Sequence, residues 1–400
     1  MRSMGISHRH AFSCDIDPSV QKYIRACCPP DGPLFDDMLR RAAQDVPAHS
    51  VYVCGFPCTP FSSLRGHSTR LFGEAAARPF FAAVKFIREH LPALAVAENV
   101  PGIAKVMKRV VSAFTALRWY RVLVIFIDPT TLGEPVRRPR YYFVLVRQDV
   151  AALTDAKDIE EYVQTVLAAA ARPCTDTVAQ RMLPAHHLAV RQCLATQPGT
   201  TATTRERRGG EPKWAKHHAD FRRMHGAPSS RVSSVAGLRS SRCQDSWRLL
   251  SRAHSSAKLV ADVSQSIHRA TVRVDGVCPT IARNSVIVVA EAGRIMVPLE
   301  KLLVHNFPLH KMKLPCDVTA TTLSNLGGNT MHLASIGLAL LIGIGLIDWS
   351  KNAASPGQKP RGHVPRAPGV IVFPRSAAPA SSQKRQAAKA SARRAKRVRR

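Results

Sequence analysis

Three groups of polar or reactive residues each close a short apolar run in the first hundred residues. Asp15-Ile16-Asp17 end the run 10–16, Pro57-Cys58 follow the run 50–56, and Glu98-Asn99 end the run 94–100. If the runs are parallel strands, these groups meet at one edge, because the carboxyl ends of parallel strands face the same side of a sheet. That edge would carry an acid suited to ribose hydroxyls, a thiol and a second carboxylate.

The cysteine becomes informative through its context. A lone cysteine after a buried strand is usually a small, inert apolar residue. Cys58, however, stands in the string GFPCTPFS (55–62), which is followed in order by AENVPGI (97–103) and RRPRYYFVLV (137–146). These strings resemble the motifs of the DNA (cytosine-5) methyltransferase family. The family's Pro-Cys dipeptide falls on Pro57-Cys58, its Glu-Asn-Val triplet starts at Glu98, and its paired arginines fall on Arg138 and Arg140.

Later segments extend the resemblance to about residues 5–345. CPTIARNS (278–285) and GRIMVPLEKLLVHNFP (293–308) look like the family's late block, and Gly328-Asn329 look like the Gly-Asn pair that opens its last core helix. Two positions depart from the family pattern, since Thr59 and Val136 stand where the family has glutamine. The late motifs indicate that the chain returns to its first domain after a variable region.

The resemblance implies methylation of cytosine at C5. Because C5 is a poor nucleophile, the family adds a thiolate to C6 of the base, and Cys58 corresponds to that thiolate. Glu98 would hold N3 and the exocyclic amine, Arg140 would contact the base carbonyl, and Arg138 would lie nearer the backbone. The base must leave the duplex first. The substrate is expected to be DNA; a tRNA cytosine, or nucleic-acid binding without turnover, are the alternatives.

The resemblance also implies S-adenosyl-L-methionine as the methyl donor. Asp15 matches the acid that binds the ribose hydroxyls, Ile16 the residue that packs on adenine, and Asp37, or else Asp36, the residue that bonds its amine. Pro57 and Asn329 would complete the pocket. The family's glycine-rich DxFxGxGG turn is not found, so we expect the first strand and first helix of the family's sheet to be missing, in an incomplete chain or a non-catalytic relic.

The elements that position these residues are predicted from periodicity. Apolar runs at 10–16, 50–56, 94–100, 121–127 and 140–147 alternate with helical patterns at 80–91 and 103–117, which is typical of an α/β fold with a largely parallel sheet. The resemblance makes this a Rossmann-like methyltransferase sheet. The predicted domains are a catalytic domain at 1–150, an irregular target-recognition region at 151–275, a return segment at 276–348, with a strand pair at 281–290, and a disordered basic tail at 349–400.

Composition points to a polyanionic partner. The net charge is +31, from 58 Lys and Arg against 27 Asp and Glu, and such a surplus favours nucleic acid. A basic stretch lies in the variable region, and two interpretations of it stay open. It either holds the nucleic-acid strand or is a solvated, disordered insert. Its residues are Arg205, Arg207, Arg208, Lys213, Trp214, Lys216, Arg222 and Arg223. The tail from Lys384 to Arg400, with its Lys-Arg and Arg-Arg pairs, is interpreted as a nuclear localisation or phosphate-binding segment, with a merely solubilising run as the alternative.

Two further kinds of site are not expected. The ten cysteines have no CxxC spacing and are interpreted as reduced thiols, and His186-His187 and His217-His218 are adjacent pairs rather than ligand-spaced sets, so no metal is expected. The apolar stretch 333–347 is about five residues short of a membrane span. It is predicted to be a buried helix, and no membrane partner is expected.

Overall fold

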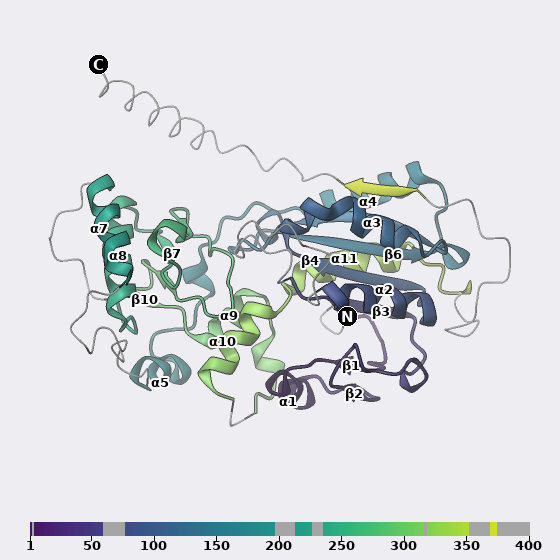
Figure 1. Cartoon of the computed structure of the whole chain (residues 1–400), viewed down its shortest axis with the longest axis horizontal. Coiled ribbons are helices and arrows are strands. Elements are labelled where there is room, and N and C mark those ends of the chain that lie inside the picture. The colour runs from purple at the N-terminus through teal and green to yellow at the C-terminus, as the bar shows by residue number, and fades with distance from the viewer. Residues whose placement is uncertain are drawn as a thin grey trace, which may run out of the picture.

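The computed structural model describes residues 1, 4–58, 77–196, 213–225, 235–315, 318–351 and 369–373. Figure 1 shows an elongated molecule with two halves. One half is built on a five-stranded sheet in the order β11-β5-β6-β4-β3, and the other contains a four-stranded sheet in the order β10-β9-β7-β8. The α/β fold class expected from the sequence is therefore present.

The larger sheet is mixed rather than parallel. Its strands are β3 (Val51–Gly55), β4 (Leu94–Asn99), β5 (Tyr120–Ile127), β6 (Arg140–Arg147) and β11 (Val370–Phe373). β3 is parallel to β4, and β11 to β5, but β6 is antiparallel to both β4 and β5. The connection between β5 and β6 contains a 3-10 turn and no helix, so the chain returns beside β5 in the opposite direction.

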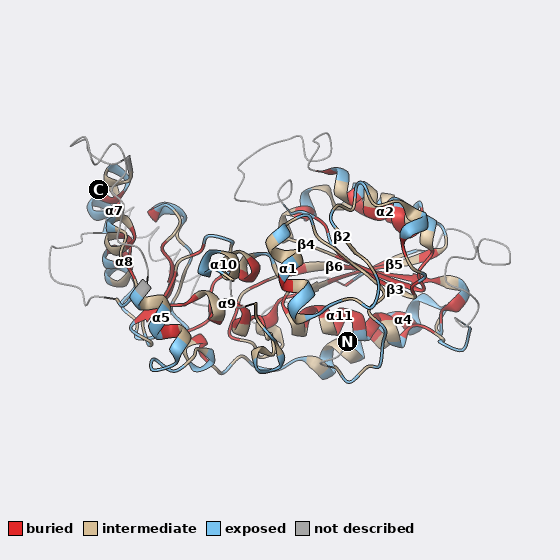
Figure 2. Ribbon diagram, turned by 90° about the horizontal axis from the view of Figure 1, so that it is seen from below, coloured by how far each residue is buried: buried red, intermediate tan, exposed pale blue. Residues whose placement is uncertain are grey.

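Helices cover both faces of this sheet, as Figure 2 shows. The helices α2 (Arg78–His90) and α3 (Met107–Thr115) pack on one face through a core that includes Phe80, Phe114 and Phe143. The helices α4 (Ala156–Ala170) and α11 (Leu333–Gly345) pack on the other face. The three layers bury the strands that end at the predicted rim.

The helix α11 is a core element. Ala339 and Ile342 are fully buried, and a Cβ at Gly343 would lie 2.5 Å from Cδ1 of Leu94. The longer helical stretch Ala320–Gly345 is apolar and long enough to pass for a membrane span, with half of its most apolar window buried in the protein. The burial of α11 against the sheet confirms the prediction of a buried helix.

The first apolar run forms its own small sheet. Of residues 10–16, only β1 (Ser13–Cys14) is a strand, and it pairs in parallel with β2 (Leu34–Phe35). Between them lies α1 (Pro18–Cys27), whose N-terminus is capped by the Asp17 side chain. Phe12 stacks on Tyr52 of β3 at 6.5 Å between ring centroids, yet among the described residues no strand pairs with the outer edge of β3. In the described part of the chain, β3 is therefore the edge strand of the sheet.

The second half contains more regular structure than its composition suggests. The region 151–275 includes α5 (Leu188–Thr196), α7 (Lys213–His225) and α8 (Ser241–Ala253). Its sheet is formed by β7 (Val260–Asp262), β8 (Val272–Arg273), β9 (Ile287–Val289) and β10 (Arg294–Ile295), followed by α9 (Pro298–Val304) and α10 (Ala320–Asn329). The strand pair expected at 281–290 is wrong, because only β9 forms there and it pairs with β7 and β10. The predicted domain boundaries stay predictions.

Part of the predicted tail is ordered. β11 comes from this tail and pairs with β5 along four residues, with Ile371 and Phe373 buried. The expectation of disorder is wrong for this segment, because its β-branched and aromatic residues alternate between the two faces of a strand. The remaining tail residues from 374 onward lie outside the described part of the chain.

Candidate active site

The rim predicted from the motifs lies where β3, β4 and β6 meet. Gly55 of β3 is in register with Glu98 of β4, and Glu98 is in register with Tyr142 of β6. β6 runs antiparallel, so its first residue, Arg140, lies at the same end of the sheet as the last residues of β4. The sheet thus brings residues from three distant motifs to one edge.

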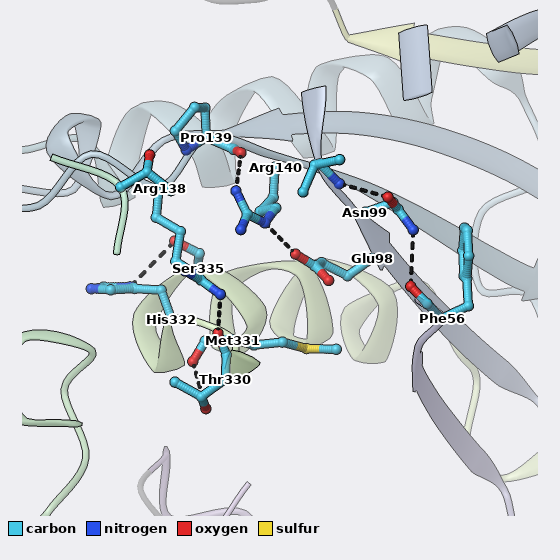
Figure 3. A network of polar contacts seen from close by, with 12 residues as sticks. Phe56, Glu98, Asn99, Arg138, Pro139, Arg140, Thr330, Met331, His332 and Ser335 are labelled. Atoms are coloured by element: carbon cyan, nitrogen blue, oxygen red, sulfur yellow. Dashed lines mark hydrogen bonds and ion pairs between the residues drawn. The ribbon is translucent and has the colours of Figure 1, made fainter. Parts of the chain in front are cut away.

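Glu98 and Arg140 form an ion pair at this rim (Figure 3). Nε of Arg140 lies 2.7 Å from Oε1 of Glu98, and the two side chains are 9% and 12% exposed. Arg140 also donates to the carbonyl of Pro139 at 2.8 Å. A shielded pair of this kind holds a carboxylate in a fixed orientation, ready to accept hydrogen bonds from a flat polar ligand.

Arg138 has a different environment from Arg140. Its guanidinium is buried and donates to the carbonyls of Ile281 and Gly328, each at 3.1 Å, and to that of Thr330 (Figure 3). Burial lowers the pKa of Arg138 to about 9, and the charge of Arg140 acts in the same direction. Arg138 therefore joins the late segments of the chain to β6, which makes it a positioning residue.

Asn99 fixes the end of β3. Its Nδ2 donates to the carbonyl of Phe56 at 3.0 Å, its Oδ1 accepts from the backbone N–H of Val100 at 2.9 Å, and its side chain is 1% exposed. Sequence reasoning named Asn99 only as part of a motif. This hydrogen bond holds the backbone at Phe56, which is the residue just before Pro57-Cys58.

Cys58 is exposed and follows β3 by three residues. β3 ends at Gly55, which is in register with Glu98 of β4, so Cys58 follows the strand end at this rim. Residues 59–76, which include Thr59, lie outside the described part of the chain. The exposed thiol thus comes three residues after the strand position that is in register with Glu98.

Three side chains behind the rim were missed by sequence reasoning. His305 and His332 are buried with their rings 5.9 Å apart, and His332 lies 3.4 Å from the hydroxyl of Ser335. Burial, together with the charge of Arg138, lowers the pKa of His332 to about 3. Met331 covers Gly55, since a Cβ on this glycine would lie 2.7 Å from Cε of Met331. No spacing rule marks these residues, because their role depends on tertiary contacts.

The residues expected to hold the donor follow strands of the small and the larger sheet or end the helix α10. Asp15 follows β1, and its Oδ1 accepts from the N–H of Asp17 at 2.9 Å; burial raises the pKa of this carboxyl. Ile16 is 73% exposed. Asp37 follows β2 and accepts from the N–H of Leu39 at 2.8 Å. An exposed apolar side chain next to a half-buried acid fits the adenosine part of a nucleoside sulfonium.

The other two expected donor residues come from segments that follow β3 and end α10. Pro57 follows β3, and Asn329 is the last residue of α10. The carbonyl of the preceding Gly328 is bonded to Arg138, so Asn329 stands beside the active-site arginine.

A second polar chain joins α7 to α8. Nδ1 of His218 lies 2.7 Å from Asp245, and its Nε2 lies 3.3 Å from the hydroxyl of Ser246. Ser246 and His218 are buried, so this arrangement connects helices rather than presenting a nucleophile.

Among the described residues no three His, Cys, Asp or Glu side chains are grouped as metal ligands. Of the predicted basic stretch, residues 205–208 lie outside the described chain, and Arg222 and Arg223 pair with Asp245 and Asp220.

The sequence profile of the C-5 cytosine-specific DNA methylase family matches residues 2–310. The chain belongs to this family. Type II methyltransferase M.DsaV of Dactylococcopsis salina is 27% identical over 140 residues, which cover 33% of this chain and 38% of that protein. M.MspI of Moraxella sp. is also 27% identical over 140 residues, covering 33% of this chain and 32% of that protein. The chain thus spans about a third of the length of the curated relatives it matches.

Solved methyltransferase structures also resemble this chain. The S. pombe Dnmt2 methyltransferase is 11% identical with a TM-score of 0.49, covering 86% of this chain and 93% of that chain. A putative DNA modification methyltransferase encoded within an E. coli prophage is 14% identical with a TM-score of 0.46, covering the same shares of the two chains.

Proposed function

We propose that this protein transfers a methyl group from S-adenosyl-L-methionine to C5 of a flipped-out cytosine in DNA, with Cys58 as the nucleophile. One observation carries the proposal: the exposed Cys58 follows the strand end that is in register with Glu98, and Glu98 is paired with Arg140. Nε of Arg140 and Oε1 of Glu98 are 2.7 Å apart. Membership of the cytosine C5 methylase family gives this rim its reaction class.

The chemistry assigns one task to each side chain. The Cys58 sulfur forms a bond to C6, and the electron pair of the C5–C6 double bond becomes available at C5. Glu98 holds N3 and the exocyclic amine, while Arg140 orients the carboxylate and reaches the base carbonyl. The donor, when bound, supplies an electrophilic methyl group. Loss of the C5 proton then breaks the sulfur–C6 bond and restores the aromatic ring and the free thiolate.

Five residues would hold the donor. Asp15 would accept from the ribose hydroxyls and Ile16 would pack on adenine, with Asp37, Pro57 and Asn329 completing the pocket. The exposed Ile16 beside the half-buried Asp15 supports this assignment. We expect Asp15→Ala to weaken donor binding in calorimetry, whereas Asp31→Ala, which lies outside this group, should not. Equal donor affinity for both variants would contradict the assigned pocket.

Transfer of a labelled methyl group tests the function. DNA and tRNA are offered in separate reactions, since the cytosine ring is the same in both. We expect incorporation into DNA by the unaltered chain, none by Cys58→Ser, and undiminished incorporation by Cys28→Ser, which alters another exposed thiol. Incorporation only into tRNA would reassign the substrate. Binding without incorporation into either would favour a protein that keeps the fold without turnover.

A further inference from the structure

The strand β11 determines where the basic tail leaves the fold. It pairs in parallel with β5, and its last residue, Phe373, is in register with Ile125. Ile125 is in register with Tyr142 of β6, and Tyr142 is in register with Glu98 of β4. Phe373 and Glu98 therefore stand in one row across the sheet. An antiparallel strand at the same edge would have directed the tail to the opposite end.

This row places the start of the tail close to the active site. Neighbouring strands lie about 4.8 Å apart, so the three strand spacings between Phe373 and Glu98 span about 14 Å. This distance corresponds to about four base pairs of a duplex, at about 3.4 Å per pair. β11, the yellow arrow in Figure 1, points toward the half that contains the four-stranded sheet. The tail thus begins beside the rim that Cys58 follows.

The tail that follows β11 carries only positive charge. Residues 374–400 contain ten lysines and arginines and neither aspartate nor glutamate. The first pair of cations, Lys384-Arg385, begins eleven residues beyond Phe373, and a chain of that length spans at most about 40 Å. The cations of the tail can therefore reach the phosphates on either side of a base bound at the rim.

The described surface at this end of the sheet is also basic. The 3-10 turn that follows β4 (Pro101–Val106) contains Lys105, and the first turn of α3 contains Lys108; both side chains are exposed. No aspartate or glutamate occurs between Asn99 and Ile127, so this segment offers the two lysines no carboxylate of its own. The helix α3 packs on β5, the neighbour of β11. Cations thus lie on the described surface next to the start of the tail.

We propose that the tail is an arm that holds a DNA strand beside the active site, and that β11 is the anchor that sets the direction of this arm. The inference rests on the proposed function for its partner, because the rim is where the target base would bind. Phosphate contacts dominate sequence-independent affinity, and an anchor raises the effective concentration of the cations near the bound strand. Ile371 and Phe373 hold the anchor in the core, whereas Val372 is 57% exposed.

Two matched substitutions test the anchor. Ile371→Asp places a carboxylate in the core and should release β11 from β5, whereas Val372→Asp adds the same charge to the exposed face of the same strand. Each is made in the full-length chain and in a full-length chain whose nine lysines and arginines within residues 376–400 are replaced by glutamine. Binding to a DNA duplex is then measured in the absence of the methyl donor.

We expect the neutral tail to weaken DNA binding about tenfold in the Val372→Asp chain and less than about threefold in the Ile371→Asp chain. An equal loss in the two chains would mean that the tail has no fixed place, and the proposal would be overturned. If Ile371→Asp is not folded at the assay temperature, Phe373→Ala takes its place, because it removes a buried ring without burying a charge.

The failure of this proposal is distinguishable from the failure of the proposed function. The binding measurement needs neither the donor nor the Cys58 thiol, so it is repeated with Cys58→Ser, and the same difference between the anchor variants is expected. A chain that transfers no methyl group but shows this difference would contradict the methyl transfer and support the arm. A chain that transfers methyl groups without the difference would contradict the arm alone.

A second pair of variants tests whether the DNA lies at this end of the sheet. Lys105 follows the rim end of β4, whereas Lys157 is an exposed residue at the start of α4, which follows the opposite end of β6. We expect Lys105→Gln to lower the salt-dependence slope for a DNA duplex by about 0.9, the value for one phosphate contact, and Lys157→Gln to keep the slope. Equal slopes for the two variants would place the DNA elsewhere and overturn the proposal.

Discussion

Arg138 and Arg137 are adjacent but have opposite surroundings. Arg138 is buried and donates to three backbone carbonyls, whereas Arg137 pairs with Asp128 and is 40% exposed. We expect Arg138→Lys to lower the free energy of unfolding by about 3 kcal/mol, because lysine cannot reproduce the guanidinium fork and leaves carbonyls unbonded. Arg137→Lys should cost less than about 1 kcal/mol. Urea unfolding measures both, and equal losses would contradict the positioning role of Arg138.

His332 should make stability depend on pH. Its pKa is about 3 in the folded chain and 6.5 ordinarily, so the unfolded chain takes up a proton below pH 6.5 that the folded chain does not. The stability contribution is complete above pH 6.5 and is lost as the pH falls toward 3, at about 1.4 kcal/mol per unit. The free energy of unfolding is measured between pH 7 and 4 for the unaltered chain and for His332→Leu. The unaltered chain should lose more of it as the pH falls than His332→Leu does. Parallel pH profiles would argue against it.

The residues show how far motifs can predict a site. The strand ends predicted a rim with Asp15, Cys58 and Glu98, and the resemblance added Arg140 as a contact to the base. The structure brings Glu98 and Arg140 to 2.7 Å, whereas Asp15 follows β1 of a separate sheet; the catalytic roles stay predictions. The contact of Asn99 with Phe56 and the buried histidines behind Arg138 were not foreseen. A buried polar contact between distant segments leaves no local periodicity in the sequence.

At the scale of elements, the contact between α11 and the sheet depends on a small residue. A Cβ at Gly343 would lie 2.5 Å from Cδ1 of Leu94, whereas at Gly337 the nearest atom, Sδ of Met4, is 3.4 Å away. Gly343→Ala should cost about 1–3 kcal/mol through overpacking. Gly337→Ala should be neutral or stabilise the helix by up to about 1 kcal/mol. Thermal unfolding of both variants distinguishes them, and equal effects would contradict the close approach.

The elements also show which predictions local patterns support. Apolar runs located β3, β4, β5 and β6 to within a residue or two, because buried strands are continuous apolar segments. The direction of β6 was not predictable from its own residues, since direction depends on the connection before it. The helix α8 was missed because arginine and serine separate its buried residues, Cys243, Trp247 and Leu250.

At the scale of the whole molecule, the basic tail follows the last described strand. β11 ends at Phe373, and residues 376–400 carry nine of the 58 basic residues. We expect a chain ending at residue 375 to unfold at the same temperature as the full chain, but to bind DNA with a smaller salt-dependence slope. A fluorescent fusion of this shorter chain should also lose nuclear accumulation, which we propose for the full chain. Unchanged nuclear accumulation would contradict the proposed role of the tail.

The central claim is that Cys58 bonds to the target cytosine. The most direct measurement is covalent capture on DNA containing 5-fluorocytosine in the presence of S-adenosyl-L-methionine, because fluorine at C5 cannot leave as a proton and the sulfur–C6 bond persists. We predict a complex that survives denaturation for the unaltered chain and for Cys28→Ser, and none for Cys58→Ser. A denaturation-resistant complex that still forms with Cys58→Ser would contradict the assignment of the nucleophile.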